Sequence, residues 1–235
     1  MATEQITLYT AKLCPFAHRV ELTLNESNVK FTRYEVDLMK KPEWYQPKVN
    51  PVSKVPALTY GGPEVPPDQP SSESAKLAES LVLVEFIADL YPDSPVVPKT
   101  PLERARARFF IDAVSNKFVS PWLATWMHGA SSESVFAGIE AIQSLLKGKY
   151  ALGDQLTIAD IVILPFIARM ELSLRDNVGT FTVEEGKQMH EKYKNDPKYA
   201  RFRQYAADMK SRESFVKTWH EDYVAKVYAK KFARS

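Results

Sequence analysis

The chain has 235 residues, of which 45% are hydrophobic and 26% are charged, and its formal net charge is +2. This composition is typical of a soluble globular protein, and the balanced charge argues against nucleic acid or a membrane as main partner. The sequence contains neither a membrane-span pattern nor, in "MATEQITLYT", a secretory signal peptide. Its only cysteine, Cys14, cannot form an internal disulfide, so we expect a reducing, cytoplasmic location.

The first 91 residues predict a mixed α/β domain. Alternating or short β-prone runs indicate strands, and amphipathic runs indicate helices. Strands are expected within 5–10, 29–38, 54–60 and 75–78, helices over 15–28 and 79–91, and a short helix starting at Pro42. Residues 61–74, "GGPEVPPDQPSSES", are dense in glycine, proline and serine and predict an exposed loop, to which we assign no role.

A proline-rich segment, 92–101, predicts a linker to a second, all-helical domain over 102–235. Helical periodicity predicts helices over 102–128, 132–148, 157–175, 183–194 and 197–209, with more helix beyond. Within "TIADIVILPFIAR", Thr157 is expected to cap its helix and Asp160 to bond back to the helix start. Both are therefore expected to act in folding, and Pro165 is expected to kink the helix.

Cys14 lies between a predicted strand and a predicted helix whose first residue is Pro15. A lone cysteine usually just packs in a core, but a helix N-terminus and nearby positive charge favour the thiolate. Lys12 and Arg19 supply such charge. His18 lies one turn on and is a weak candidate base, because its side chain is expected to face elsewhere. A dithiol redox site would need a second cysteine at position 17, which is alanine. A mixed disulfide on Cys14 must therefore be resolved by an external small thiol or not at all.

Five segments together resemble a glutathione transferase of the omega class or a fungal omega-like relative: "CPFAHR", "KKPEW", "NPVSKVPAL", "ESLVLVEFIADLYP" and "TIADIVILPFIAR". The resemblance covers nearly the whole chain. It implies a thioredoxin-like N-terminal domain with a mixed four-stranded sheet, followed by an all-α C-terminal domain. It also implies a cytosolic homodimer with glutathione as co-substrate and no metal.

The resemblance assigns Cys14 as the residue that forms a mixed disulfide with glutathione. It also implies a set of glutathione contacts, in which Pro56 is the family's cis-proline: Phe16, Lys41, Val55, Pro56, Glu79 and Ser80. Their chemistry suits glutathione, which is an extended anionic tripeptide. A backbone edge can pair with the peptide like a strand, the lysine can meet one carboxylate, and a helix N-terminus can bind the carboxylate at the other end. Ser80 is expected to be the N-cap of its helix.

By the same resemblance, the site for a hydrophobic co-substrate lies between the domains against Cys14. Its wall is expected to come from the second domain, through Trp122, Trp126, Arg169 and Phe215. Ordinary core packing is the alternative for each aromatic residue. An aromatic cleft would suit planar aromatic ligands.

Three functions remain open at this point. The first is a glutathione transferase with thioltransferase, deglutathionylating and dehydroascorbate-reducing activity, which a cysteine at position 14 favours over conjugation. The second is a protein of detoxification that sequesters or weakly conjugates hydrophobic aromatic compounds such as polyphenols. The third is a non-enzymatic transferase-like module, against which the retained cysteine and glutathione contacts argue.

Overall fold

The computed structural model describes residues 4–234, which divide into two compact units with the boundary between Pro95 and Val96. The first unit is built on a sheet of order β2-β1-β3-β4. Strand β1 (Ile6–Thr10) runs parallel to β2 (Thr32–Glu35) and antiparallel to β3 (Ala57–Tyr60), and β3 runs antiparallel to β4 (Ala75–Ala78). The predicted mixed four-stranded sheet and thioredoxin-like domain are thus confirmed.

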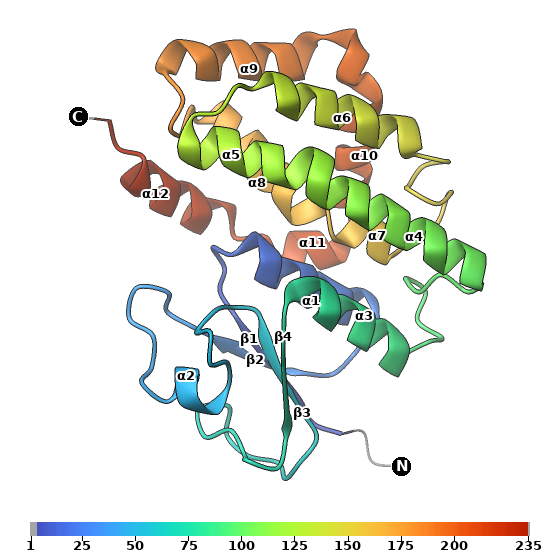
Figure 1. Cartoon of the computed structure of the whole chain (residues 1–235), viewed down its shortest axis with the longest axis vertical. Helices are drawn as coiled ribbons and strands as arrows, with labels where there is room; N and C mark the ends of the chain where they lie inside the picture. Colours follow the sequence, from blue (N-terminus) through green and yellow to red (C-terminus); the bar gives the residue numbers. More distant parts are fainter. Residues whose placement is uncertain (1–3, 235) are drawn as a thin grey trace. The chain divides into compact units, whose positions relative to one another are not determined.

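Alternation along β1 sends its side chains to two different cores. Leu8 belongs to a core shared by the sheet with α1 (Pro15–Glu26) and α3 (Ser80–Leu90), the helices drawn beside each other in Figure 1. Tyr9 belongs to the core on the opposite face, which contains Tyr45 of α2 (Tyr45–Lys48). Because α1 and α3 share one face, their N-termini can lie close together, and this positions the candidate site.

Two expectations about helix starts in this unit are wrong. The short helix begins at Tyr45 and not at Pro42, because a turn precedes it in which the Tyr45 N–H donates to the Pro42 carbonyl at 3.0 Å. Ser80 is not a cap but the first residue of α3. Glu79 is the N-cap, since its φ of 71° and ψ of 112° make the turn out of β4 and leave helical geometry to start one residue later.

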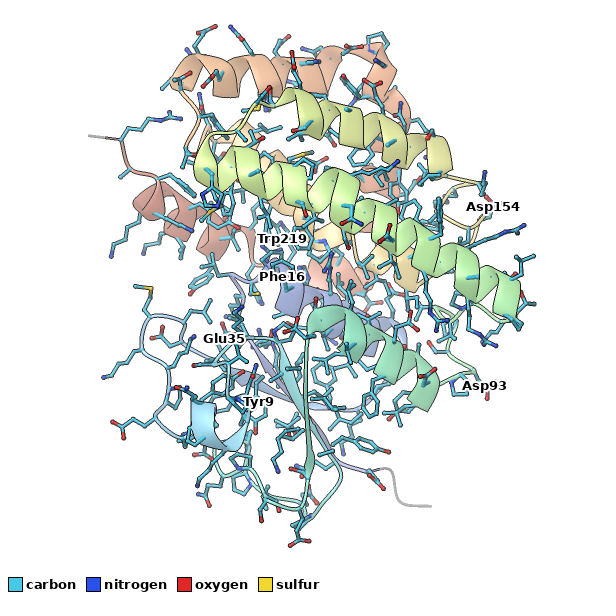
Figure 2. The ribbon with its side chains drawn as sticks, viewed as in Figure 1. Tyr9, Phe16, Glu35, Asp93, Asp154 and Trp219 are labelled. Atoms are coloured by element: carbon cyan, nitrogen blue, oxygen red, sulfur yellow. The ribbon has the colours of Figure 1, made fainter. Side chains whose placement is uncertain are left out.

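The proline-rich loop 61–74 is anchored to Tyr9 of β1 and to Gln5, the residue before that strand. The hydroxyl of Tyr9, labelled in Figure 2, donates to the Pro67 carbonyl at 2.8 Å. The Gln5 side chain donates to the Val65 carbonyl and accepts from the Val65 N–H, both at 3.3 Å. The loop is therefore held against the sheet by specific bonds to buried or half-buried residues.

The second unit opens with one long rod, drawn in green in Figure 1, made of α4 (Pro101–Ala113), a π-helical segment η1 (Val114–Val119) and α5 (Ser120–His128). It corresponds to the single helix predicted over 102–128. Helix α6 (Glu133–Leu145) crosses η1 at Gly138. A Cβ there would lie 1.8 Å from the Lys117 carbonyl oxygen, so only glycine allows this approach.

The helix predicted over 157–175 is two helices, α7 (Ile158–Ile161) and α8 (Leu164–Arg175), so the expected kink at Pro165 is wrong. Pro165 lies in the first turn of α8, where its missing N–H breaks no helical bond. The predicted back-bond at the start of α7 is present: the Asp160 carboxylate accepts from the Thr157 N–H at 2.8 Å and from its hydroxyl at 3.0 Å.

The remaining helices are α9 (Val183–Asn195), the 3₁₀ turn η2 (Pro197–Tyr199), α10 (Ala200–Lys210), α11 (Glu213–Thr218) and α12 (Glu221–Lys231). The second unit is therefore all-helical, as expected. Over the described range, 4–234, we find neither a helix with the length and apolarity to span a membrane nor a cluster of three potential metal ligands.

Candidate functional site

Cys14 is the N-cap of α1 and is partly buried. Its sulfur accepts from the Ala17 N–H at 3.4 Å, one of the donors that a helix leaves open at its start. The thiol also lies 3.7 Å from the Val55 carbonyl, to which it donates. The sulfur therefore lies at a helix N-terminus, as the sequence predicted, and such a position favours negative charge on a thiol.

The backbone beside Cys14 is presented by a cis peptide bond between Val55 and Pro56, the isomer that the resemblance implied. Lys41 reaches the same segment, because its ammonium donates to the Ser53 carbonyl at 2.5 Å. Ser53 itself has a φ of 55°. The structure thus brings Val55 and the Lys41 amine to the short stretch that leads into β3.

Glu79 and Ser80 lie at the start of α3. Glu79 is exposed, and its positive φ is one that side chains other than glycine rarely adopt and that often accompanies functional sites. Ser80 is only 7% exposed, and its hydroxyl oxygen accepts from the Arg19 guanidinium at 3.3 Å. This bond joins the second turn of α1 to the first residue of α3.

Arg19 was counted in the sequence only as a nearby positive charge, and its place in the site was missed. It is 2% exposed, and its guanidinium lies 5.4 Å from the centre of the Phe16 ring. Burial lowers the pKa of Arg19 to about 10, and the negative charge of Cys14 opposes that shift. The signal in the sequence was its place five residues after Cys14, in the helix that this cysteine precedes.

The predicted site residues of the second unit form two aromatic clusters. In the first, the rings of Trp122 and Trp126 stack at 6.2 Å with an interplanar angle of 15°. Trp126 is covered by Tyr228 at 4.7 Å and Phe232 at 5.0 Å, both from the end of the chain. Trp122 and Trp126 are 2% and 8% exposed, so both pack within the helical unit.

The second cluster centres on Trp219, labelled in Figure 2, which sequence reasoning missed. Its ring stacks on Phe215 at 5.8 Å, and the Arg169 guanidinium lies 5.0 Å from its centre. Arg169 and Phe215 are each 3% exposed, whereas Trp219 is half-buried. The signal in the sequence was the four-residue spacing of Phe215 and Trp219, which places both on one side of a helix.

Both units of the chain match known proteins. Residues 8–95 match the family model "Glutathione S-transferase, N-terminal domain" and residues 102–207 match "Glutathione S-transferase, C-terminal domain". Glutathione transferase Omega 1C of Trametes versicolor is 51% identical, with a TM-score of 0.94 over 98% of this chain and 97% of that one. Omega 2S of the same fungus, solved with 2,4-dihydroxybenzophenone, is 39% identical, with a TM-score of 0.91 over 98% and 99%.

Curated relatives are more distant. Glutathione S-transferase omega-1 of Mus musculus is 25% identical over 176 residues, which cover 71% of this chain and 68% of that protein. Pyrimidodiazepine synthase of Drosophila melanogaster is 30% identical over 170 residues, and the match spans only 65% of its length.

Proposed function

Because the chain belongs to the glutathione transferase family, in its omega-like branch, we propose that it is a glutathione-dependent thiol transferase and reductase that works through Cys14. The observation that carries the proposal is the position of the Cys14 sulfur, which caps α1 and accepts the Ala17 N–H. A thiolate held there attacks a sulfur atom and does not need a separate base.

In the proposed cycle, the Cys14 thiolate attacks the glutathione sulfur of a mixed disulfide. A Cys14–glutathione disulfide forms, and the other sulfur leaves as a thiolate that takes a proton from water. A second glutathione thiolate then attacks the glutathione sulfur of this adduct, which releases oxidised glutathione and restores Cys14. The chain has no other cysteine, so this second thiol must come from solution. Deglutathionylation of carbon adducts and reduction of dehydroascorbate are the further activities we propose.

The remaining residues of the first unit would hold glutathione in place. In the proposal, Lys41 meets the glycyl carboxylate, the Val55 backbone pairs with the cysteinyl part, and Glu79 and Ser80 receive the γ-glutamyl end. The Val55 carbonyl accepts from the Cys14 thiol at 3.7 Å, and Phe16, 36% exposed, follows Cys14 in the first turn of α1. Strand-like pairing and an amino-terminal helix turn suit such a peptide.

The test is intact mass after incubation with oxidised glutathione, for the wild type and for Cys14→Ser. We expect one glutathione adduct on the wild type, none on the variant, and thioltransferase activity that disappears with the adduct. A wild-type protein that binds glutathione yet forms no adduct would refute the reductase mechanism.

A second candidate function is the binding of hydrophobic aromatic compounds, favoured by the relative solved with 2,4-dihydroxybenzophenone. We propose that Trp122, Trp126, Arg169 and Phe215 contribute to such binding, with the half-buried ring of Trp219 as the accessible stacking surface. Quenching of tryptophan fluorescence by that benzophenone should weaken in Trp219→Leu. We further propose a cytoplasmic homodimer, which light scattering on the purified protein would check.

A further inference from the structure

Arg19 contacts both ends of the candidate glutathione site from a buried position. Its guanidinium donates to the Ser80 hydroxyl oxygen at 3.3 Å and lies 5.4 Å from the centre of the Phe16 ring. Arg19 also lies in α1, the helix that Cys14 caps, and the charge of Cys14 opposes the lowering of its pKa by burial. Arginine is seldom 2% exposed, because desolvating its charge is costly unless other groups compensate. A side chain placed here at such a cost is a candidate for a role beyond packing.

We propose that Arg19 is a positioning residue that couples the thiol end of the glutathione site to its γ-glutamyl end. At the thiol end its charge favours the Cys14 thiolate. At the other end it fixes the direction of the Ser80 hydroxyl. This inference rests on the proposed function in one respect, since it takes Cys14 and Ser80 to be contacts of glutathione.

The direction of the Ser80 hydroxyl follows from the hydrogen-bond donors of its partner, Arg19. A guanidinium has five N–H donors and no acceptor, so in this bond Ser80 must be the acceptor. The single hydroxyl proton of Ser80 then points to a different group, and a bond already accepted from a cation makes it a stronger donor. A carboxylate at the start of α3 would receive that proton, which is what the γ-glutamyl end of glutathione offers.

The effect of Arg19 on Cys14 is electrostatic. The pKa values of Arg19 and of Tyr45, on α2, both respond to the charge of Cys14. Burial raises the pKa of Tyr45 further above its ordinary value, so its phenol is neutral at physiological pH. Glu79, the N-cap of α3, is exposed and adjoins Ser80. Of Arg19 and Tyr45, Arg19 alone carries a charge at neutral pH, and that charge favours the thiolate.

The first measurement needs no glutathione. The rate of Cys14 alkylation by iodoacetamide, followed by intact mass from pH 4 to 10, reports the midpoint of thiolate formation. We expect Arg19→Gln, which keeps an N–H donor but loses the charge, to raise that midpoint by about one pH unit. Arg19→Lys should keep it close to wild type. Lys30→Met, which removes an exposed charge beyond the far end of α1, is the control for net charge and should leave it unchanged.

The second measurement is the affinity for reduced glutathione by calorimetry. Ser80→Ala should weaken binding about tenfold without moving the alkylation midpoint, because it removes one bond to a charged group. Arg19→Met should also weaken binding. The double variant with Ser80→Ala should lose little more affinity than Ser80→Ala alone, since both changes act on the one contact between the Ser80 hydroxyl and glutathione. Circular dichroism establishes that each variant is folded.

An unmoved alkylation midpoint in folded Arg19→Gln, or additive losses of affinity in the double variant, would overturn the proposal. If Arg19→Gln does not fold, Arg19→Lys decides, because a midpoint that rises by about a unit although the charge is kept contradicts the electrostatic role. Failure of Cys14 to form a glutathione adduct would refute the proposed function yet leave the alkylation result standing, so the two failures are distinguishable.

Discussion

Replacing Asp160 by alanine should be among the most damaging single changes in the helical unit. The carboxylate is fully buried and accepts four hydrogen bonds: two from Thr157, one from the Ala151 N–H at 2.7 Å and one from the Tyr205 hydroxyl at 2.8 Å. Burial raises the pKa of Asp160, and these donors oppose the shift. The carboxylate therefore ties the start of α7 to a preceding loop and to α10.

The expected loss follows from those four bonds. Each contributes about 1 kcal/mol net, and the donors left behind stay buried, so Asp160→Ala should lower the free energy of unfolding by about 4 kcal/mol. For a chain of this size, that corresponds to a fall in melting temperature of roughly 8–16 °C. Asp160→Asn keeps one carbonyl oxygen as acceptor and should lose about half as much.

Thermal and urea unfolding followed by circular dichroism would measure these losses, and the chain offers a matched control. The same capping box occurs at the start of α9, where Thr182 and Glu185 exchange bonds at an exposed site. Glu185→Ala removes the motif's carboxylate without burying any donor, so its effect should be far smaller. Equal losses for Asp160→Ala and Glu185→Ala would refute the reasoning, because burial is what separates the two sites.

Two further predictions follow from packing and charge. Gly138→Ala should cost about 3 kcal/mol or more, because its Cβ would collide with the Lys117 backbone carbonyl, which cannot swing aside; a urea midpoint equal to wild type would contradict this. Hydrogen bonds from Arg175, then Trp219, lower the pKa of Glu221 in the folded protein. The Glu221 carboxylate therefore stabilises the fold above its unfolded pKa of about 4.3, and this stabilisation is lost as the pH falls through the lower pKa of the folded state. Glu221→Gln should therefore lose about 0.5 kcal/mol in urea unfolding at pH 7 and less than that at pH 3, and an equal loss at both would be inconsistent with this ion pair.

Local patterns predicted most of the first unit. Alternation in "QITLYT" placed β1, and the structure sends Leu8 and Tyr9 to opposite faces, as a period of two requires. The errors concern where helices begin, because the first residue of a helix depends on the turn that precedes it. Pro165 is an example. A proline within a continuous apolar pattern predicts a kinked helix, but a turn precedes Leu164, and Pro165 lies in the first turn of the new helix α8.

The candidate site was predictable only in part, because its residues come from distant parts of the chain. The helix start beside Cys14 could be read locally, since Pro15 marks it. The bond between Arg19 and Ser80 spans 61 positions, and neither residue's sequence context signals the other. The same holds for Trp126, whose cover comes from Tyr228 and Phe232 at the end of the chain. Their roles therefore had to come from the fold.

The loop 61–74 illustrates the limit of composition most clearly. Glycine, proline and serine predicted exposure, which is correct for its tip, yet the loop has anchors that composition does not reveal. Tyr9 of β1 is wholly buried, and its hydroxyl donates a hydrogen bond to the Pro67 carbonyl. Burial raises the pKa of this phenol to about 12. A buried hydroxyl needs a partner, and the loop supplies it. The loop thus supplies the hydrogen-bond acceptor for a buried hydroxyl in the core that contains Tyr9 and Tyr45.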